Sequence, residues 1–322
     1  MTALTRLIRV FVAVGLTAIV LWTSHPSAVA GAAAGAKLSW IGAAVALVAI
    51  DRTLMAYRWL ILLCALAPGT RPPFGAVLRI FFVSTFVGTF LPSLGGDVYR
   101  AYSLARLHVS GVESAASVLM DRVLGALSIL VCGVAALAVA PHLPLSTGVY
   151  ATLGVAAGAC AVAAAIVFHD RAGSAALAIA ARLPGARVRR VAAGLTDAVR
   201  RYARYHAQLG HVLALSIGVQ VLRILQAWCL GLSLGMTASI GAYFVFIPII
   251  LLIMLLPITI NGLGTSQLAF VWLFQQAAVP APQAFALSIL FVALGVVGNL
   301  PGGLLYATAP AGRPDTVPEG RR

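Results

Sequence analysis

The stretch Leu91–Tyr102, LPSLGGDVYRAY, interrupts one of the most apolar parts of the chain. It follows an apolar run that begins at Phe74, and it brings a proline, two glycines, an aspartate and an arginine close together. Irregular backbone at membrane depth is tolerated only where it is buried in protein or lines a wet cavity. The stretch therefore predicts a helix that enters the membrane, breaks, and turns back as an amphipathic helix to about Leu107.

The composition identifies an integral membrane protein. Of the 322 residues, 61% are hydrophobic and only 9% are charged, whereas soluble proteins carry roughly 25% charged residues. The net charge of +14 falls mainly in loops between apolar runs, which is the positive-inside pattern of membrane proteins rather than a nucleic-acid-binding surface. The four cysteines and six histidines are scattered, so we expect no metal site. We also expect no cofactor and, from the distribution of charge, no nucleic-acid partner.

Six apolar segments are long enough to be transmembrane helices. We expect them at 4–23, 38–57, 115–140, 148–168, 209–234 and 284–307. Two further segments, 74–107 and 243–280, are broken by proline and glycine and are predicted to be re-entrant hairpins. The residues expected to form the hairpins are Pro92, Gly95 and Gly96 in the first, and Pro257, Gly262 and Gly264 in the second.

The predicted fold is all-α, with a single transmembrane domain over residues 1–308. A basic connector at 169–206 joins a first half, 1–168, to a second half, 207–308. A polar Pro/Gly-rich tail at 309–322 is predicted to be disordered. The arginines of the connector and the tail place both termini in the cytoplasm.

Two segments allow two interpretations each. A positively charged start, a short apolar run and the sequence SAVAGA make residues 1–30 either a signal peptide or an uncleaved first span, and we favour the span. The connector carries eight arginines and apolar residues at helical spacing. This pattern is typical of an amphipathic helix on an anionic lipid surface, and the alternative is a solvated basic loop.

The two broken segments resemble each other. Each has Leu-Pro, a glycine-containing break and an amphipathic piece, and each precedes a long span with an Ala/Ser-rich start. With both termini inside, the hairpins enter the membrane from opposite faces. This arrangement predicts an inverted repeat with a transporter site near the midplane. The alternative is that proline and glycine merely kink two helices.

Charged residues within apolar segments need a reason, because a charge at the bilayer centre costs about 2.5–3.5 kcal/mol. Ion pairing is one reason, and we expect Asp97 to pair with Arg100, and Asp121 with Arg122 or another arginine. Adjacent residues on a helix face different ways, so Asp121 and Arg122 should find separate partners. A ligand is the other reason, because the arginine fork suits a phosphate and helix N-termini attract anions.

The candidate lipid-binding residues are Asp97, Arg100, Asp121, Arg122, Arg223, Asn261 and Gln267. Within the first hairpin we expect Arg100 to face the ligand and Asp97 to shape the turn by capping the outgoing helix. Gln220, Arg223 and Gln226 share one helix face. Asp51 and Arg52 are expected to form a structural pair.

The stretches GTFLPSLGGDVYRAYSLAR and DRVLGAL resemble the lysylphosphatidylglycerol synthase transmembrane-region family of flippase-like membrane proteins. The resemblance rests on Leu91, Pro92, Gly95, Gly96, Asp97, Arg100, Leu104 and Arg106, on Asp121-Arg122, and on Pro257, Gly262 and Gly264. It covers nearly the whole chain and implies the lipid-translocating part without the aminoacyl-transferring domain. Where the family has a later glutamate this chain has Gln267, which hydrogen-bonds but cannot ionise.

These patterns lead to one expected function and two alternatives. We expect a flippase-like protein of the bacterial inner membrane that translocates or binds a phosphate-bearing lipid and is not an enzyme. The first alternative is a non-catalytic partner of a lipid or glycan biosynthetic enzyme, and the second is a lipid-linked glycosyl or aminoacyl transferase. The sequence contains no GxSxG, HExxH or P-loop pattern.

Overall fold

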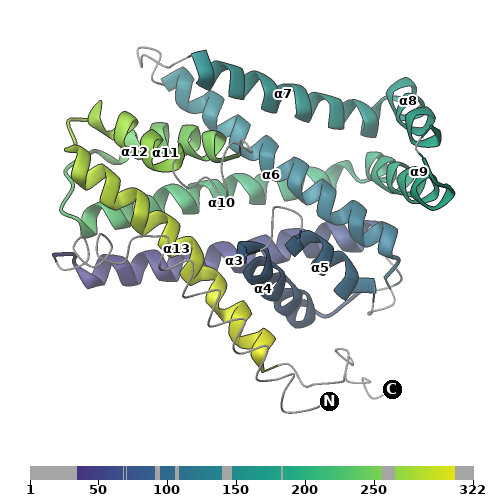
Figure 1. The fold of residues 1–322 in the computed structure, drawn as a ribbon, viewed down its shortest axis with the longest axis horizontal. Helices are drawn as coiled ribbons and strands as arrows, with labels where there is room; N and C mark the ends of the chain where they lie inside the picture. The colour runs from purple at the N-terminus through teal and green to yellow at the C-terminus, as the bar shows by residue number, and fades with distance from the viewer. Residues whose placement is uncertain are drawn as a thin grey trace.

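The computed structural model describes residues 35–67, 69, 71–90, 95–105, 109–139, 147–182, 184–255 and 265–308. In these ranges the regular secondary structure is entirely helical, which confirms the all-α prediction. The elements are α3 (Leu38–Leu66), α4 (Phe74–Phe90), α5 (Gly95–Ala105), α6 (Gly111–Val139), α7 (Thr147–Phe168), α8 (Asp170–Ala181), α9 (Ala186–Arg201), η1 (Tyr202–Arg204), α10 (His206–Ser233), α11 (Ile240–Leu255), α12 (Thr265–Gln275) and α13 (Ala281–Ala307) (Figure 1).

Four described helices are long and apolar enough to cross a membrane, namely α3, α6, α10 and α13. A fifth candidate is the pair of α7 and α8, which qualifies only when the two helices are taken together and which bends by 97° between them. These five correspond to the spans predicted from 38–57 onward, and the chain is a multi-pass membrane protein. The predicted span 4–23, the alternative of a signal peptide and the predicted disordered tail all lie outside the described residues.

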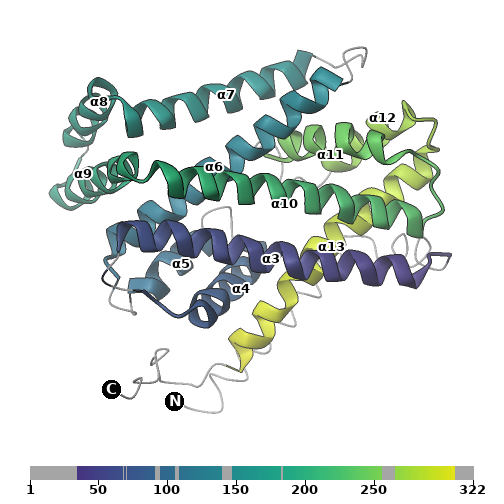
Figure 2. The ribbon, with the colours of Figure 1, turned by 180° about the vertical axis from the view of Figure 1, so that it is seen from behind.

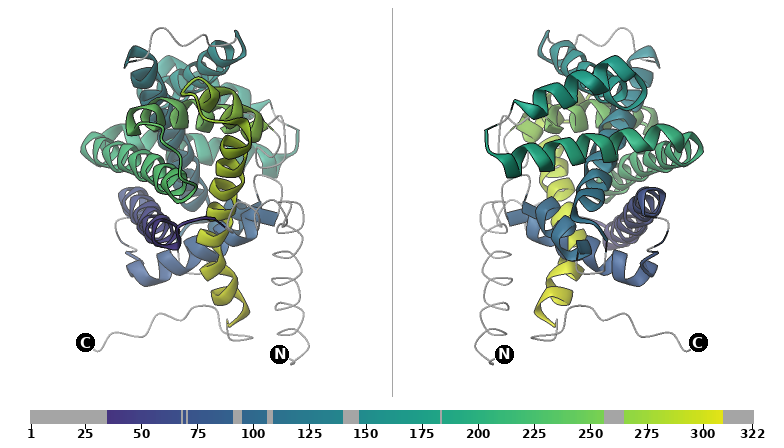
Figure 3. Two further views of the ribbon diagram at one scale, coloured as in Figure 1. Left: turned by 90° about the vertical axis from the view of Figure 1, so that its left-hand side faces the viewer. Right: turned by 90° about the vertical axis from the view of Figure 1, so that its right-hand side faces the viewer.

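Among the described helices, α3 and α10 share the most extensive contact. They are antiparallel, because Arg58 contacts Ser216 while the Lys37 N–H at the other end of α3 donates to the Ser233 carbonyl at 3.0 Å. Figure 2 shows the two helices side by side, and Figure 3 views them nearly end-on. The predicted end of this span near Tyr57 was too early, since α3 continues to Leu66 with Arg58 and Trp59 buried.

The first broken segment is a helical hairpin, as predicted. Gly96 packs on Gly88, and the Arg100 Nε donates to the Ser84 Oγ at 3.2 Å, so α5 runs back along α4. A Cβ on Gly96 would lie 2.5 Å from the Ser84 carbonyl oxygen, so only glycine allows this approach. Gly95 is the first residue of α5, whereas Pro92 lies outside the described residues.

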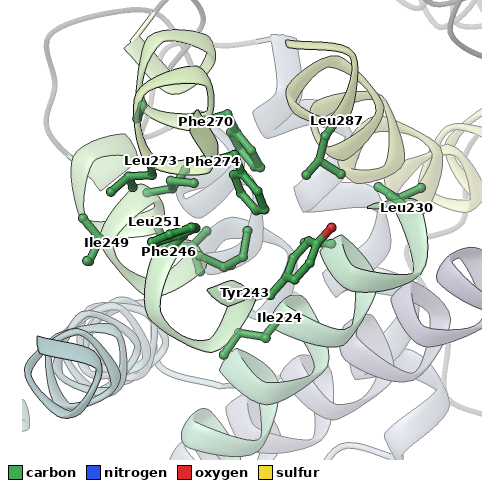
Figure 4. Packing of buried hydrophobic residues seen from close by; sticks show 14 of the residues in the cluster. Ile224, Leu230, Tyr243, Phe246, Ile249, Leu251, Phe270, Leu273, Phe274 and Leu287 are labelled. Carbon is green, nitrogen blue, oxygen red and sulfur yellow. The ribbon is translucent and has the colours of Figure 1, made fainter. Parts of the chain in front are cut away.

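The second broken segment has the same form. The Phe274 ring of α12 lies 5.0 Å from the Tyr243 ring and 5.2 Å from the Phe246 ring of α11, centroid to centroid. These contacts bring α12 back along α11, and Figure 4 shows the apolar core that the two helices build with α10 and α13. The predicted hairpin residues Pro257, Gly262 and Gly264 lie outside the described residues.

The two hairpins pack reciprocally. Helix α4 of the first hairpin packs on α13, while α11 of the second packs on α6. At the first of these contacts a Cβ on Gly302 would overlap the Phe82 carbonyl, and Gly303 lies directly against the Phe86 ring. The predicted inverted repeat, with hairpins that enter from opposite faces, stays a prediction.

The basic connector is largely helical, and it folds back onto one end of the bundle (Figure 1). The Arg200 Nη2 bonds the Asp170 carboxylate at 2.6 Å, which ties α9 to α8. The Arg201 Nη2 bonds Glu113 of α6 at 3.0 Å, and the Tyr202 hydroxyl donates to the Leu62 carbonyl at 2.9 Å. Burial raises the pKa of the Tyr202 hydroxyl, so it stays a neutral donor.

Candidate functional site

Charged side chains gather between α3, α5, α6 and α10. Two clusters are named here after their carboxylates: the Asp121 cluster contains Arg58, Arg100 and Asp121, and the Asp51 cluster contains Asp51, Arg52 and Arg223. A third group is the pair formed by Asp97 and Arg122. Together they place five arginines and three aspartates among apolar helices.

Arg58 holds the carboxylate of the Asp121 cluster. Its Nε and Nη2 lie 2.8 Å and 2.7 Å from the Asp121 Oδ1, and its Nη1 donates to the Ser216 Oγ at 2.8 Å. Both Arg58 and Asp121 are buried, with 3% and 4% of their surface exposed. Arg58 thus joins α3 to α6 and α10 through short charge-assisted bonds, which are the strong class of hydrogen bond.

Arg100 is more distant from the same carboxylate and interacts with it more weakly. Its Nη1 lies 3.7 Å from the Asp121 Oδ2, which is beyond hydrogen-bonding distance. Its guanidinium carbon lies 4.8 Å from the Trp59 ring centroid and 4.7 Å from the Phe81 ring centroid. The rings and the Ser84 hydroxyl orient the guanidinium, but they leave its charge only partly compensated.

Asp97 pairs with Arg122, so the predicted pairing of Asp97 with Arg100 was wrong. The Arg122 Nε and Nη2 each donate to a separate Asp97 oxygen at 3.0 Å. The expectation that Asp121 and Arg122 find separate partners is confirmed. Asp97 lies inside the first turn of α5 rather than at a capping position before it, and a carboxylate there also complements the helix dipole.

The Asp51 cluster lies near the middle of α3. The Arg52 Nη1 donates to the Asp51 Oδ2 at 3.1 Å, which confirms the expected pair. Arg223 of α10 joins it, with its Nε 3.6 Å from the Asp51 Oδ1. Both arginines also contact the Met55 sulfur at 3.6 Å. Two guanidinium groups therefore share one buried carboxylate here, as they do in the Asp121 cluster.

A polar contact lies between the clusters. Along α3, Asp51 and Arg58 are seven residues apart, which is about 10 Å at 1.5 Å per residue. On α10 the Gln220 Nε2 donates to the Ser128 Oγ of α6 at 2.9 Å. Gln220 and Gln226 are both buried, and the Gln220 Oε1 and the Gln226 Nε2 have no hydrogen-bond partner.

The remaining predicted site residues lie elsewhere. Gln267 is in the first turn of α12, where its Oε1 accepts a hydrogen bond from the Ser266 hydroxyl at 3.0 Å. Asn261 is outside the described residues. Among the described residues no group of three or more His, Cys, Asp or Glu side chains could hold a metal ion.

Arg58 was not predicted as a site residue, because the span was expected to end at residue 57. A signal was present, because the apolar run resumes after Trp59 and continues to Leu66. The two rings around Arg100 were not predictable either, since contacts of Trp59 and Phe81 with a residue on another helix leave no local sequence pattern.

Comparison with known proteins gives one family. The family model described as the lysylphosphatidylglycerol synthase TM region matches residues 6–302, which is nearly the whole chain. No curated protein and no solved structure matches the chain.

Proposed function

Because the chain belongs to the lysylphosphatidylglycerol synthase TM region family, we propose that it binds a phosphate-bearing lipid between its helices and translocates it across the membrane. The proposal assigns no catalytic step to the chain. The headgroup enters the bundle at the charged clusters, and the acyl chains stay in the bilayer.

The state of Arg100 carries this proposal. Its guanidinium is buried, with 5% of the residue exposed, yet the carboxylate beside it is already bound by Arg58 at 2.7 Å. A buried charge is stable only when it is paired and hydrogen-bonded. A phosphate oxygen supplies both, because a guanidinium presents donors in the geometry that phosphate accepts.

Arg122 lies at the accessible edge of the site. Its side chain is 63% exposed, whereas its partner Asp97 is only 12% exposed. Where this edge of the site is open to water, an exposed ion pair is weak, with a typical contribution of about 0–1 kcal/mol. A headgroup phosphate therefore replaces Asp97 as the partner of Arg122 at little cost in free energy. Arg100 lies one helical turn beyond Asp97 on α5, so a phosphate at Arg122 is close to Arg100 as well.

A leaflet-exposure assay tests the proposal. Purified protein is reconstituted into vesicles that contain acyl-labelled phosphatidylglycerol, and the label reached by a membrane-impermeant quencher is followed in time. We expect faster exchange than in protein-free vesicles, and at least a tenfold loss in Arg100→Gln. The control is Lys37→Gln, which removes one exposed positive charge at the N-terminal end of α3 and should retain the rate.

The same assay addresses the alternative functions. A non-catalytic partner of a biosynthetic enzyme would leave the lipid distribution unchanged and would co-purify with that enzyme. A transferase would change the mass of the lipid, which mass spectrometry of the recovered lipids detects. Either result, with no exchange above protein-free vesicles, would contradict the proposed translocation.

We further propose that the chain resides in the bacterial inner membrane with both termini in the cytoplasm, and that α8 and α9 rest on anionic lipid. The 97° bend after α7 directs α8 across the axis of that helix, as an interfacial helix requires. Around the α8–α9 turn, apolar Ile179, Val188 and Val191 are exposed. The basic residues Arg182, Arg189 and Arg190 are exposed beside them, and arginines near a surface favour anionic lipid.

A further inference from the structure

The charge balance of the site restricts which headgroup it accepts. Five arginines face three aspartates in the two clusters and the Asp97–Arg122 pair, which leaves a surplus of two positive charges. The Asp97–Arg122 pair is neutral, so one surplus charge belongs to the Asp121 cluster and one to the Asp51 cluster.

The other described acidic residues lie at or near the connector. The full sequence contains eight acidic residues. Glu113 is bound by Arg201 and Asp170 by Arg200, both at the connector. Asp197 is exposed on α9, and the last two, Asp315 and Glu319, follow the final described residue in the sequence. The three aspartates of the site are thus the carboxylates that the described bundle interior provides for its five arginines.

We propose that the site selects a lipid whose headgroup is a net anion, with a phosphate and no ammonium group, and discriminates against a lysylated headgroup. This inference rests on the proposed translocation and adds its substrate class. A phosphate at either cluster neutralises one surplus charge in a medium where uncompensated charge is costly. A lysyl group instead brings further positive charge beside guanidinium groups that already outnumber their carboxylates.

The hydrogen-bonding capacity of the carboxylates leads to the same choice. An ammonium ion is recognised by oxygen acceptors, and carboxylates are the strongest of these. The Asp121 Oδ1 already receives two short bonds from Arg58, and both Asp97 oxygens are bound by Arg122. The Asp51 Oδ2 is bound by Arg52, whereas its Oδ1 has no hydrogen-bond partner and lies 3.6 Å from the Arg223 Nε. A lysyl ammonium at the Asp51 Oδ1, or at the Asp121 Oδ2 that lies 3.7 Å from Arg100, would therefore be placed directly beside guanidinium groups of its own charge.

The test uses the full-length protein in vesicles and four lipids with the same labelled acyl chain: phosphatidylglycerol, phosphatidic acid, phosphatidylethanolamine and lysylphosphatidylglycerol. We expect the first two to exchange at least about tenfold faster than the lysylated lipid, with phosphatidylethanolamine between them. Faster exchange of phosphatidic acid than of phosphatidylglycerol assigns the site to a phosphate monoester, and the reverse order assigns it to a diester.

The outcomes separate the two proposals. Exchange of all four lipids at the protein-free rate overturns the proposed translocation itself. Exchange of lysylphosphatidylglycerol as fast as, or faster than, phosphatidylglycerol overturns only the charge selectivity. Arg223→Gln lowers the surplus to one charge and should reduce the ratio of anionic to lysylated exchange. If that variant fails to fold, the lipid panel on the unchanged protein still decides the question.

Discussion

Two arginines of the Asp121 cluster should respond differently to the same substitution. Arg58→Gln removes both short bonds to Asp121 and the bond to Ser216. Breaking a buried ion pair costs about 3–5 kcal/mol, and since Arg100 remains 3.7 Å from the freed carboxylate, we expect the lower end, about 3 kcal/mol. Arg100→Gln loses one hydrogen bond to Ser84, the 3.7 Å ion pair with Asp121 and the contacts with two rings. It also removes a buried charge whose desolvation is costly, and Arg58 still holds the Asp121 carboxylate, so we expect a smaller net loss of about 1 kcal/mol.

The loss of lipid exchange in the two variants should follow the opposite order to the loss of stability. Arg100→Gln should retain most of the stability and lose at least tenfold in lipid exchange, whereas Arg58→Gln should lose stability first. Unfolding in mixed micelles gives the free energies, and exchange in vesicles gives the rates for the fraction that remains folded. Equal destabilisation by the two substitutions, with exchange falling only in proportion to folded protein, would show that Arg100 is structural and refute the reasoning.

Further predictions concern packing, surface pairing, pH and the membrane surface. Gly302→Ala should destabilise the fold by about 1–3 kcal/mol, because the new Cβ would overlap the Phe82 carbonyl. The control is Gly295→Ala on the same helix, which should leave stability unchanged because nothing lies within 4 Å of its Cβ position. Equal unfolding midpoints for the two variants would contradict the close contact at Gly302. Arg122→Gln should cost at most about 1 kcal/mol, since the pair with Asp97 is exposed on one side, and a larger loss in unfolding free energy would count against a weak pair. The raised pKa of Tyr202 means that its neutral form stabilises the fold below pH about 10 and that this contribution is lost as pH rises above that value. Above that pH the unfolding midpoint should therefore fall less steeply with pH in Tyr202→Phe than in the unchanged protein. Parallel profiles of unfolding midpoint against pH would show that Tyr202 does not contribute to the pH dependence. A polarity-sensitive label at Val191→Cys should report a more apolar environment in nanodiscs with phosphatidylglycerol than with phosphatidylcholine alone, while the label at Asp197→Cys stays unchanged; identical spectra for Val191→Cys would contradict lipid contact at α9.

The helices and the two hairpins were predictable because they follow from local properties. The length of each apolar run sets a span, and proline and glycine mark each break. The first hairpin shows this most clearly, because Gly96 allows the close approach of α5 to α4 that its position in LPSLGGD suggested.

The ion pairs were not predictable because they depend on which side of α5 faces which neighbour. Gly96 and Arg100 are four residues apart, so they share the side of α5 that packs on Ser84 of α4. Asp97 is one residue further than Gly96, about 100° around the helix, and it therefore faces Arg122 on α6. The spacing of Asp97 and Arg100 allowed a pair within α5, but the packing of the hairpin decided against it.

The most direct test of the central claim is a structure of the protein in nanodiscs that contain phosphatidylglycerol. We predict a lipid whose phosphate lies within hydrogen-bonding distance of the Arg100 guanidinium, between the Trp59 and Phe81 rings and the Asp97–Arg122 pair. A structure in which the ordered lipids lie only around the outside of the bundle, with the Arg100 Nη atoms hydrogen-bonded to Asp121 alone, would contradict the account.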